Sequence, residues 1–206
     1  MYAQLLIAVS FAMASYQDVK DRAVSDLVWL PAAGGVAYVL YSFYTGALAS
    51  GFEYFALKLV LIGGVALAFT FLGRIGEADG IAIAFVAADP YVLSPLAPLF
   101  AAAIVALSHI GYEFTRGNAR GKKTIPMAQF LREQRWIPKA IISRGTRTEV
   151  SEDVNDAREE VVASKKSDAM VEVSYGVPTV AYLGLGYVAY LVYLIVFNHA
   201  MFAALP

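Results

Sequence analysis

Long apolar blocks separated by short polar segments dominate the hydrophobic pattern of this chain. Apolar residues predominate around the whole helix in each block, with only a few polar or charged residues inside, as is typical of helices that are surrounded by lipid rather than by water. Charged residues, glycine or proline mark the ends of the blocks. The pattern predicts an all-α polytopic membrane protein with about six transmembrane helices, over 2–17, 27–44, 54–72, 81–88, 96–114 and 178–202.

The stretch 80–114 is too long for one membrane span, and its pattern predicts two helices. Asp89-Pro90 and Ser94-Pro95 interrupt it, and proline ends or kinks a helix because it lacks an N–H donor. We therefore expect a very short helix followed by one of ordinary length. At 1.5 Å per residue, the apolar core of the short helix spans only about 12 Å, far less than the hydrocarbon thickness of a bilayer.

The segment 116–173 departs from the apolar pattern and is predicted to be a small soluble insert of mixed α/β type. Its charged composition and short apolar pieces favour a surface helix over 149–160 and a strand over 170–174, with a marginal core. The predicted organisation is therefore transmembrane helices in 1–115, the insert in 116–173 and a last transmembrane helix in 174–206.

The distribution of Lys and Arg predicts which loops are cytoplasmic. If six helices span the membrane and both termini lie outside, 15 of the 16 basic residues fall on the inner side and only Lys58 falls toward the outer side. Twelve of the 16 belong to the insert, where topology and attraction to anionic lipids explain their excess over acids. We therefore expect a multi-pass protein of the cell membrane, with a cytoplasmic insert that binds no nucleic acid.

Residue types that are absent or scarce exclude several functions. The chain has no Cys, so disulfides, thiol nucleophiles and cysteine zinc sites are excluded. Its two His residues, His109 and His199, form neither an HExxH motif nor the base of a serine nucleophile. His109 and Glu113 share a helix face at i, i+4, which favours a packed polar pair or an interhelical contact over half of a metal site. We expect no metal and no small-molecule cofactor.

Two aspartates at the ends of predicted helices are candidates for catalysis, because ionisable groups in or beside a membrane span are costly. Asp18 ends the first helix and Asp79 opens the fourth, and the predicted topology puts both at the inner boundary of the bilayer. Helix capping alone would explain Asp79. The helix macrodipole, in contrast, opposes a carboxylate at a C-terminal helix end, where Asp18 lies. Pairing of Asp18 with Lys20 or Arg22 is the structural alternative.

Other conspicuous residues have structural explanations. We expect Asp21 to be solvated in the loop after the first helix, Asp26 to cap the second helix and Asp89 to form a turn with Pro90. Six glycines in the apolar blocks are expected to let helices approach each other closely: Gly34, Gly35, Gly63, Gly64, Gly184 and Gly186.

Two short motifs carry a resemblance to a known family. The first is Ser15-x-x-Asp18, which a short basic loop follows, and the second is Gly76-x-x-Asp79 at the start of a later helix. Together they resemble the type IV prepilin peptidase clan of GxGD membrane aspartyl proteases. The layout, with a soluble insert before the last helix, is most similar to the archaeal preflagellin (archaellin) peptidases. Ala78 departs from the pattern, since it stands where GxGD has its second Gly.

The resemblance implies that Asp18 and Asp79 form the catalytic pair of a membrane aspartyl endopeptidase. It also implies the substrates, which are membrane-inserted precursors of the preflagellin or prepilin kind that lose short basic leader peptides at the cytoplasmic face. Two carboxylates that share one proton can activate water as general base and general acid without a metal. Two alternatives stay open: an intramembrane protease of the signal-peptide-peptidase or presenilin type, and a proton-coupled transporter in which the two aspartates form a relay.

Overall fold

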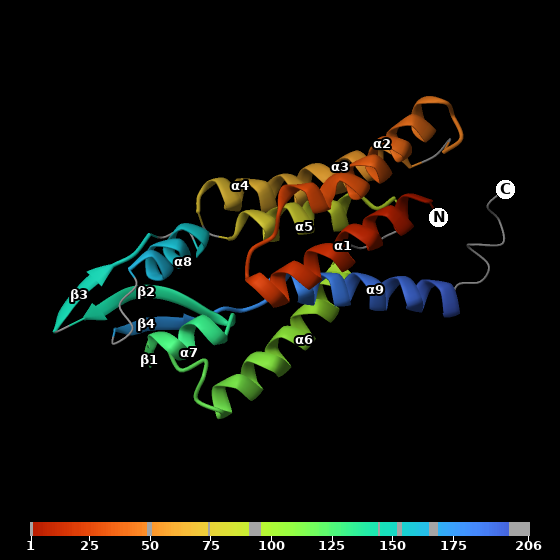
Figure 1. The fold of residues 1–206 in the computed structure, drawn as a ribbon. Helices are drawn as coiled ribbons and strands as arrows, with labels where there is room; N and C mark the ends of the chain where they lie inside the picture. The colour runs from red at the N-terminus through yellow and green to blue at the C-terminus, as the bar shows by residue number, and fades with distance from the viewer. Residues whose placement is uncertain are drawn as a thin grey trace. The chain divides into compact units, whose positions relative to one another are not determined.

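The structure, a computed structural model, describes residues 2–48, 51–73, 75–90, 96–143, 145–151, 154–164 and 169–197. The chain is mostly helical and has a small antiparallel sheet before its last helix (Figure 1). It divides into two compact units. The first comprises Met1–Tyr16, Val24–Ala106 and Thr179–Pro206, and the second comprises Gln17–Ala23 and Leu107–Pro178.

The first unit is built from helices, two of which, α1 and α6, end in the second unit. Every block that the apolar pattern predicted as a helix contains one. In chain order the helical elements are α1 (Tyr2–Asp21), the 3₁₀ turn η1 (Asp26–Trp29), α2 (Leu30–Tyr44), α3 (Phe52–Lys58), the π-helical segment η2 (Leu59–Gly64), α4 (Val65–Phe71), α5 (Glu77–Ala88), α6 (Leu96–Thr115) and α9 (Thr179–Phe197).

Four helical stretches in the described part of the chain are long and apolar enough to cross a membrane. They are Asp26–Tyr44, Phe52–Phe71, Leu96–Thr115 and Thr179–Val196. The predicted number of six spans is therefore not confirmed. Helix α5 has only 12 residues, as the prediction of a very short fourth helix required, and it is too short to cross the hydrocarbon region by itself. Helix α1 is not among the four stretches, and it contains several polar and charged residues, which make it less apolar than they are.

Close approach of helices at glycine is confirmed at four of the six predicted positions. A Cβ atom on Gly35 would lie 2.9 Å from the backbone oxygen of Ala3, and one on Gly186 would lie 2.3 Å from the backbone oxygen of Pro98. A Cβ atom on Gly184 would lie 2.4 Å from Ser15 Oγ, and one on Gly63 would be in ordinary contact, at 3.5 Å, with Ala84 Cα of α5. Gly34 and Gly64, within the described residues, have open space around them instead, so the prediction is wrong there. In each adjacent pair, only one glycine faces a neighbouring helix.

The main core of the first unit is aromatic at its centre and joins α1, η1, α5 and α9. The ring of Phe11 packs edge-on against Trp29 at 5.7 Å and stacks on Tyr187 at 5.1 Å. Trp29 in turn stacks on Phe85 of α5 at 5.5 Å. These contacts connect segments that are far apart in the sequence, so the core holds α1 and α5 in the same helical assembly.

The second unit contains a four-stranded antiparallel sheet with the strand order β1-β4-β2-β3. Its elements are β1 (Lys123–Pro126), α7 (Met127–Arg132), β2 (Trp136–Ser143), β3 (Thr146–Glu149), α8 (Val154–Ala163) and β4 (Met170–Tyr175). The predicted strand over 170–174 is confirmed. The predicted helix begins at Val154 rather than at Glu149, because residues 146–149 pair with β2 instead.

The core of the second unit is better developed than its composition suggested. Nine buried residues from both helices, three strands and an adjoining loop pack together: Ile125, Met127, Phe130, Trp136, Ile141, Val161, Ala169, Val171 and Val173. Trp136 is fully buried, and its indole N–H donates to the Glu133 carboxylate at 2.8 Å. Apolar residues scattered along the insert converge on one side of the sheet, so their low density in the sequence underestimates the core.

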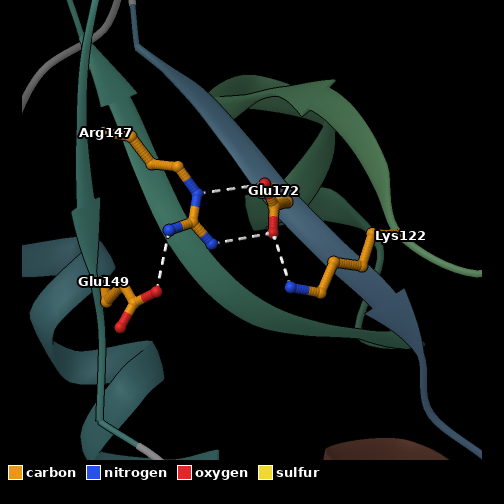
Figure 2. Close-up of polar contacts among 4 residues, drawn as sticks. All are labelled: Lys122, Arg147, Glu149 and Glu172. Carbon is orange, nitrogen blue, oxygen red and sulfur yellow. Dashed lines mark hydrogen bonds and ion pairs between the residues drawn. The ribbon is translucent and has the colours of Figure 1, made fainter.

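Charged side chains join three segments across the sheet (Figure 2). Arg147 on β3 donates to Glu172 on β4 through Nε and Nη2, at 3.2 and 3.1 Å, and to Glu149 through Nη1 at 2.8 Å. Lys122 forms an ion pair with Glu172 at 3.2 Å. The Arg147 guanidinium lowers the pKa of both carboxyl groups. These groups are accessible to water, so the network contributes more to strand register than to stability.

Candidate functional site

Asp18 lies at the end of a continuous buried face of α1. Ile7, Phe11 and Ala14 are fully buried at helical spacing, and Asp18, which follows Ala14 by one turn, is only 7% exposed. The first three belong to the apolar core of the first unit. A purely structural helix would continue this face with an apolar residue, because burying a carboxylate is costly. The face instead ends in an acid.

The end of α1 is closed immediately after Asp18 by Arg22. Arg22 has a backbone φ of 56°, the left-handed conformation that commonly ends helices. Its backbone N–H and its guanidinium Nη1 both donate to the Asp18 carbonyl, at 3.2 and 3.1 Å. A cation at this position also complements the helix macrodipole. Arg22 therefore acts as a C-cap of α1 and holds the backbone of Asp18.

Ser15, the first residue of the motif that contains Asp18, lies at a close contact between α1 and α9. A Cβ atom on Gly184 of α9 would lie only 2.4 Å from Ser15 Oγ and 3.5 Å from Phe11 Cβ. A larger residue at position 184 would displace the serine hydroxyl from its present place. The small residues of this motif region thus fix the packing of α1 one turn before Asp18.

Asp79 is the third residue of α5 rather than its N-cap. Gly76 occupies the cap position, with φ −62° and ψ 149°, so the interpretation of Asp79 as a simple cap is wrong. The half-buried carboxyl group of Asp79 turns back over this glycine, because a Cβ atom on Gly76 would lie 3.1 Å from Asp79 Oδ2. A larger residue at position 76 would crowd the carboxylate. The spacing Gly76-x-x-Asp79 therefore has a steric reason.

The residues on either side of Asp79 anchor α5 to the first unit. Gly80 is buried against α4, where an added Cβ atom would lie 1.9 Å from Thr70 Oγ1. Ala78 packs against the main core. Its methyl group is accommodated there, so the departure from the GxGD pattern at this position carries no steric penalty.

The helices that carry the two aspartates share the main core of the first unit. Ala14 of α1 and Ala82 of α5, each about one helical turn from an aspartate, belong to the same buried cluster. Asp79 belongs to the first unit, whereas Asp18 is grouped with the second. The surroundings of Asp18 are set by the buried face of α1 that it ends, and those of Asp79 by the adjacent Gly76.

The competing aspartates have other surroundings. Asp26 is exposed and is the first residue of η1, with Ser25 at the cap position, so the interpretation of Asp26 as the cap is wrong. Asp21 is half-buried rather than fully solvated. Burial lowers the pKa of the Arg158 guanidinium, and the Asp21 carboxylate opposes this effect. The Asp21 charge therefore offsets part of the effect of burial on Arg158.

His109 and Glu113 form the packed polar pair that their spacing predicted. His109 Nε2 lies 3.8 Å from Glu113 Oε1, and the buried Glu113 carboxylate accepts a 2.6 Å hydrogen bond from Asn118. Burial raises the pKa of the neighbouring Tyr175 hydroxyl, and the Glu113 charge adds to this effect. Within the residues that the structure describes, no group of three or more His, Asp or Glu side chains could hold a metal ion.

A buried polar cluster in the first unit was not anticipated. Asp89 is completely buried, and its carboxylate accepts a 2.7 Å hydrogen bond from the Tyr187 hydroxyl. Lys58, also buried, donates to the Asp89 backbone carbonyl. Asp89 does lie where α5 ends, before the turn at Pro90, but the turn alone does not account for its buried, hydrogen-bonded carboxylate. The signal that could have revealed the cluster is Lys58 itself, the one basic residue that the charge distribution left on the outer side.

Comparison with known proteins adds no family assignment to this geometry. No protein-family model matches the chain, and no curated protein matches it.

Proposed function

We propose that this protein is a membrane aspartyl endopeptidase in which Asp18 and Asp79 form the catalytic pair. Its substrates would be membrane-inserted precursors of the preflagellin or prepilin kind, from which it removes short basic leader peptides at the cytoplasmic face. The observation that carries the proposal is the buried face of α1, which continues from Ile7 through Phe11 and Ala14 and ends in Asp18. A carboxylate at that place is costly for a helix and has a clear use in catalysis.

The environment of Asp79 supports the second half of the pair. Its carboxylate lies in the first turn of α5, where the helix macrodipole favours the anion. Gly76 leaves it the space to turn back along the chain, and Gly80 and Ala78 hold the helix on both sides. These contacts keep the carboxylate on a rigid element, as a catalytic group requires.

The chemistry needs only the two carboxyl groups and a water molecule. When the pair shares one proton, the ionised carboxylate removes a proton from water, which attacks the scissile carbonyl carbon. The protonated carboxyl group donates to the carbonyl oxygen, and the amine then leaves with a proton. The pair titrates as a unit, so activity should fall when both groups are ionised and when both are protonated.

The substrate class comes from the family resemblance and agrees with the physical chemistry of the bilayer. We propose that six helices, including α1 and the short α5, form the membrane part, with both termini outside and the insert cytoplasmic. A leader with a basic segment before an apolar helix stays at the inner interface of the membrane. In this topology, Asp18 and Asp79 also lie at that interface, so such a precursor would present its cleavage point at the correct depth.

The position of the cut distinguishes this proposal from its alternatives. An intramembrane protease would cut within the apolar segment of the substrate, whereas a leader peptidase would cut at the border between the basic and the apolar segments. A proton-coupled transporter would not cut at all.

The test is to incubate the purified protein in lipid with a precursor that carries a basic leader and to determine the product masses. One new N-terminus at the end of the leader supports the proposal. Asp21→Asn and Asp26→Asn serve as matched controls and should retain activity. An intact precursor with the wild-type protein, across lipids and pH values, would refute the peptidase.

A further inference from the structure

The buried side chains of Lys58, Asp89 and Tyr187 join three helical segments of the first unit. Lys58 is the last residue of α3 and is 4% exposed, Asp89 follows the last residue of α5 and is 0% exposed, and Tyr187 lies within α9 and is 0% exposed. Tyr187 donates to the Asp89 carboxylate at 2.7 Å, and Lys58 donates to the Asp89 backbone carbonyl. One residue at the end of α5 is therefore held from two sides.

Overall stability is a poor explanation for this cluster. Taking a lysine and an aspartate out of water is expensive, and apolar residues of similar size often give equal or greater stability. A charge inside a membrane segment is also costly and usually marks a specific role. What a satisfied polar cluster adds is a defined register, because the helices fit only where all its partners meet.

Helix α5 needs such a device because of its length. Its 12 residues extend over about 18 Å, so the thickness of the bilayer cannot set its axial position as it does for a full span. Specific contacts hold it instead. Close approaches hold its N-terminal part at Gly80 against Thr70 and its middle at Ala84 against Gly63. The polar cluster holds its C-terminal end.

We infer that Lys58, Asp89 and Tyr187 form a polar lock that sets the axial position and rotation of α5, and that they thereby act as positioning residues for Asp79. Asp79 lies in the first turn of α5 and Asp89 directly follows its last residue, ten positions later, so a displacement of one end of this short helix moves the other. The consequence for cleavage rests on the proposed function. The consequence for the position of α5 does not.

The first measurement tests whether the buried charges of Lys58 and Asp89 compensate each other. Lys58→Met removes the cation and its hydrogen bond to the Asp89 backbone carbonyl, whereas Asp89→Asn keeps that carbonyl and removes only the negative charge beside the buried cation. Each single variant leaves one buried charge uncompensated by the other and should lower the apparent Tm in detergent by about 10 °C. The double variant removes both charges and should recover most of this loss. Exposed Glu53, on the same helix as Lys58, provides the control Glu53→Gln. Single variants as stable as the wild type would overturn the lock.

The second measurement tests position, which a merely stabilising cluster would not control. The chain has no Cys, so a single spin label on Glu77→Cys reports the depth and mobility of the N-terminal end of α5. The stable double variant and Tyr187→Phe should shift the label depth or add a second spectral component, whereas Tyr193→Phe, at an exposed position on α9, should not. An unchanged label in both lock variants would overturn the positioning role even if their stability changed.

Cleavage by unlabelled Lys58→Met/Asp89→Asn and Tyr187→Phe completes the test. Misplacement of Asp79 should lower kcat by about tenfold or more with little change in KM. Wild-type kcat together with a displaced label would overturn the positioning of Asp79. If the wild-type protein itself does not cleave the precursor, the proposed function fails, but the label still decides whether the lock positions α5.

Discussion

Replacement of Gly80 by alanine tests the tight contact between α4 and α5 that supports Asp79. An alanine Cβ atom would lie 1.9 Å from Thr70 Oγ1 and 3.2 Å from Thr70 Cβ. Rotation of the threonine side chain could relieve the first overlap but would break the 3.2 Å hydrogen bond from Thr70 Oγ1 to the Ala66 carbonyl. It would leave the contact with Cβ unchanged, because Cβ does not move with χ1.

The magnitude follows from these contacts. Overpacking a helix contact costs about 1–3 kcal/mol, and a lost hydrogen bond costs about 1 kcal/mol. Replacing glycine by alanine in a helix returns about 0.5–1 kcal/mol through the unfolded chain. We therefore expect Gly80→Ala to lose about 2 kcal/mol, within a range of about 1–3.5 kcal/mol, which corresponds to a fall in Tm of about 6 °C for a chain of this size.

The assay is thermal unfolding of the detergent-solubilised protein with two companion variants. Gly64→Ala, at a position with open space within the described structure, should be neutral or slightly stabilising. Thr70→Ala combined with Gly80→Ala should return to within about 2 °C of Thr70→Ala alone, because the overlap with Oγ1 is gone and only the milder 3.2 Å contact with Cβ remains. If Gly80→Ala is as stable as Gly64→Ala, the two helices do not approach as described. A loss that Thr70→Ala fails to relieve would place the clash elsewhere.

Three further predictions concern other parts of the chain. Gly186→Ala should cost about 3 kcal/mol or more in thermal unfolding, because the added Cβ atom meets the backbone oxygen of Pro98 at 2.3 Å and no side-chain change can relieve it; a neutral variant would contradict the close crossing of α6 and α9. Because Arg22 has a positive φ, which glycine adopts at lower cost than alanine, Arg22→Gly should be about 1 kcal/mol more stable than Arg22→Ala in thermal unfolding. The opposite order would refute backbone strain at position 22. The hydrogen bond from Trp136 lowers the pKa of the Glu133 carboxyl group in the folded protein. The stability that ionised Glu133 contributes is therefore present above the pKa of the unfolded state and is lost as the pH falls through the pKa of the folded state. Glu133→Gln should flatten the loss of folding stability between about pH 5 and pH 3, and an unchanged slope would refute this.

The helices of the first unit were predictable because their signal is local. An apolar block needs no information about its neighbours to indicate a helix, and the proline interruptions placed the break before α6. The irregular backbone of η2 was not predictable, because the π-helical turn after Lys58 has no local pattern. The exact start of α5 was also beyond prediction, since a shift of three residues changes Asp79 from a cap into a member of the first turn.

The polar cluster shows why part of the site was missed. Lys58 and Asp89 are separated by 31 residues, and Asp89 and Tyr187 by 98. A pair that forms only through tertiary packing leaves no periodicity in the sequence, so Asp89 beside a proline favoured a turn. The core of the insert was underestimated for the same reason, because Trp136 and its partners come from elements that meet only in the folded sheet.

The central claim, that Asp18 and Asp79 act as one catalytic unit, is tested most directly by a double-mutant cycle on precursor cleavage. The variants are Asp18→Asn, Asp79→Asn and the combination of both, each shown to be folded in the membrane before the rate is measured. The account predicts that either single variant loses nearly all activity and that the double variant is no worse than the singles, because members of one catalytic unit are not additive. Substantial cleavage by either folded single variant, or losses that simply add in the double variant, would contradict the claim.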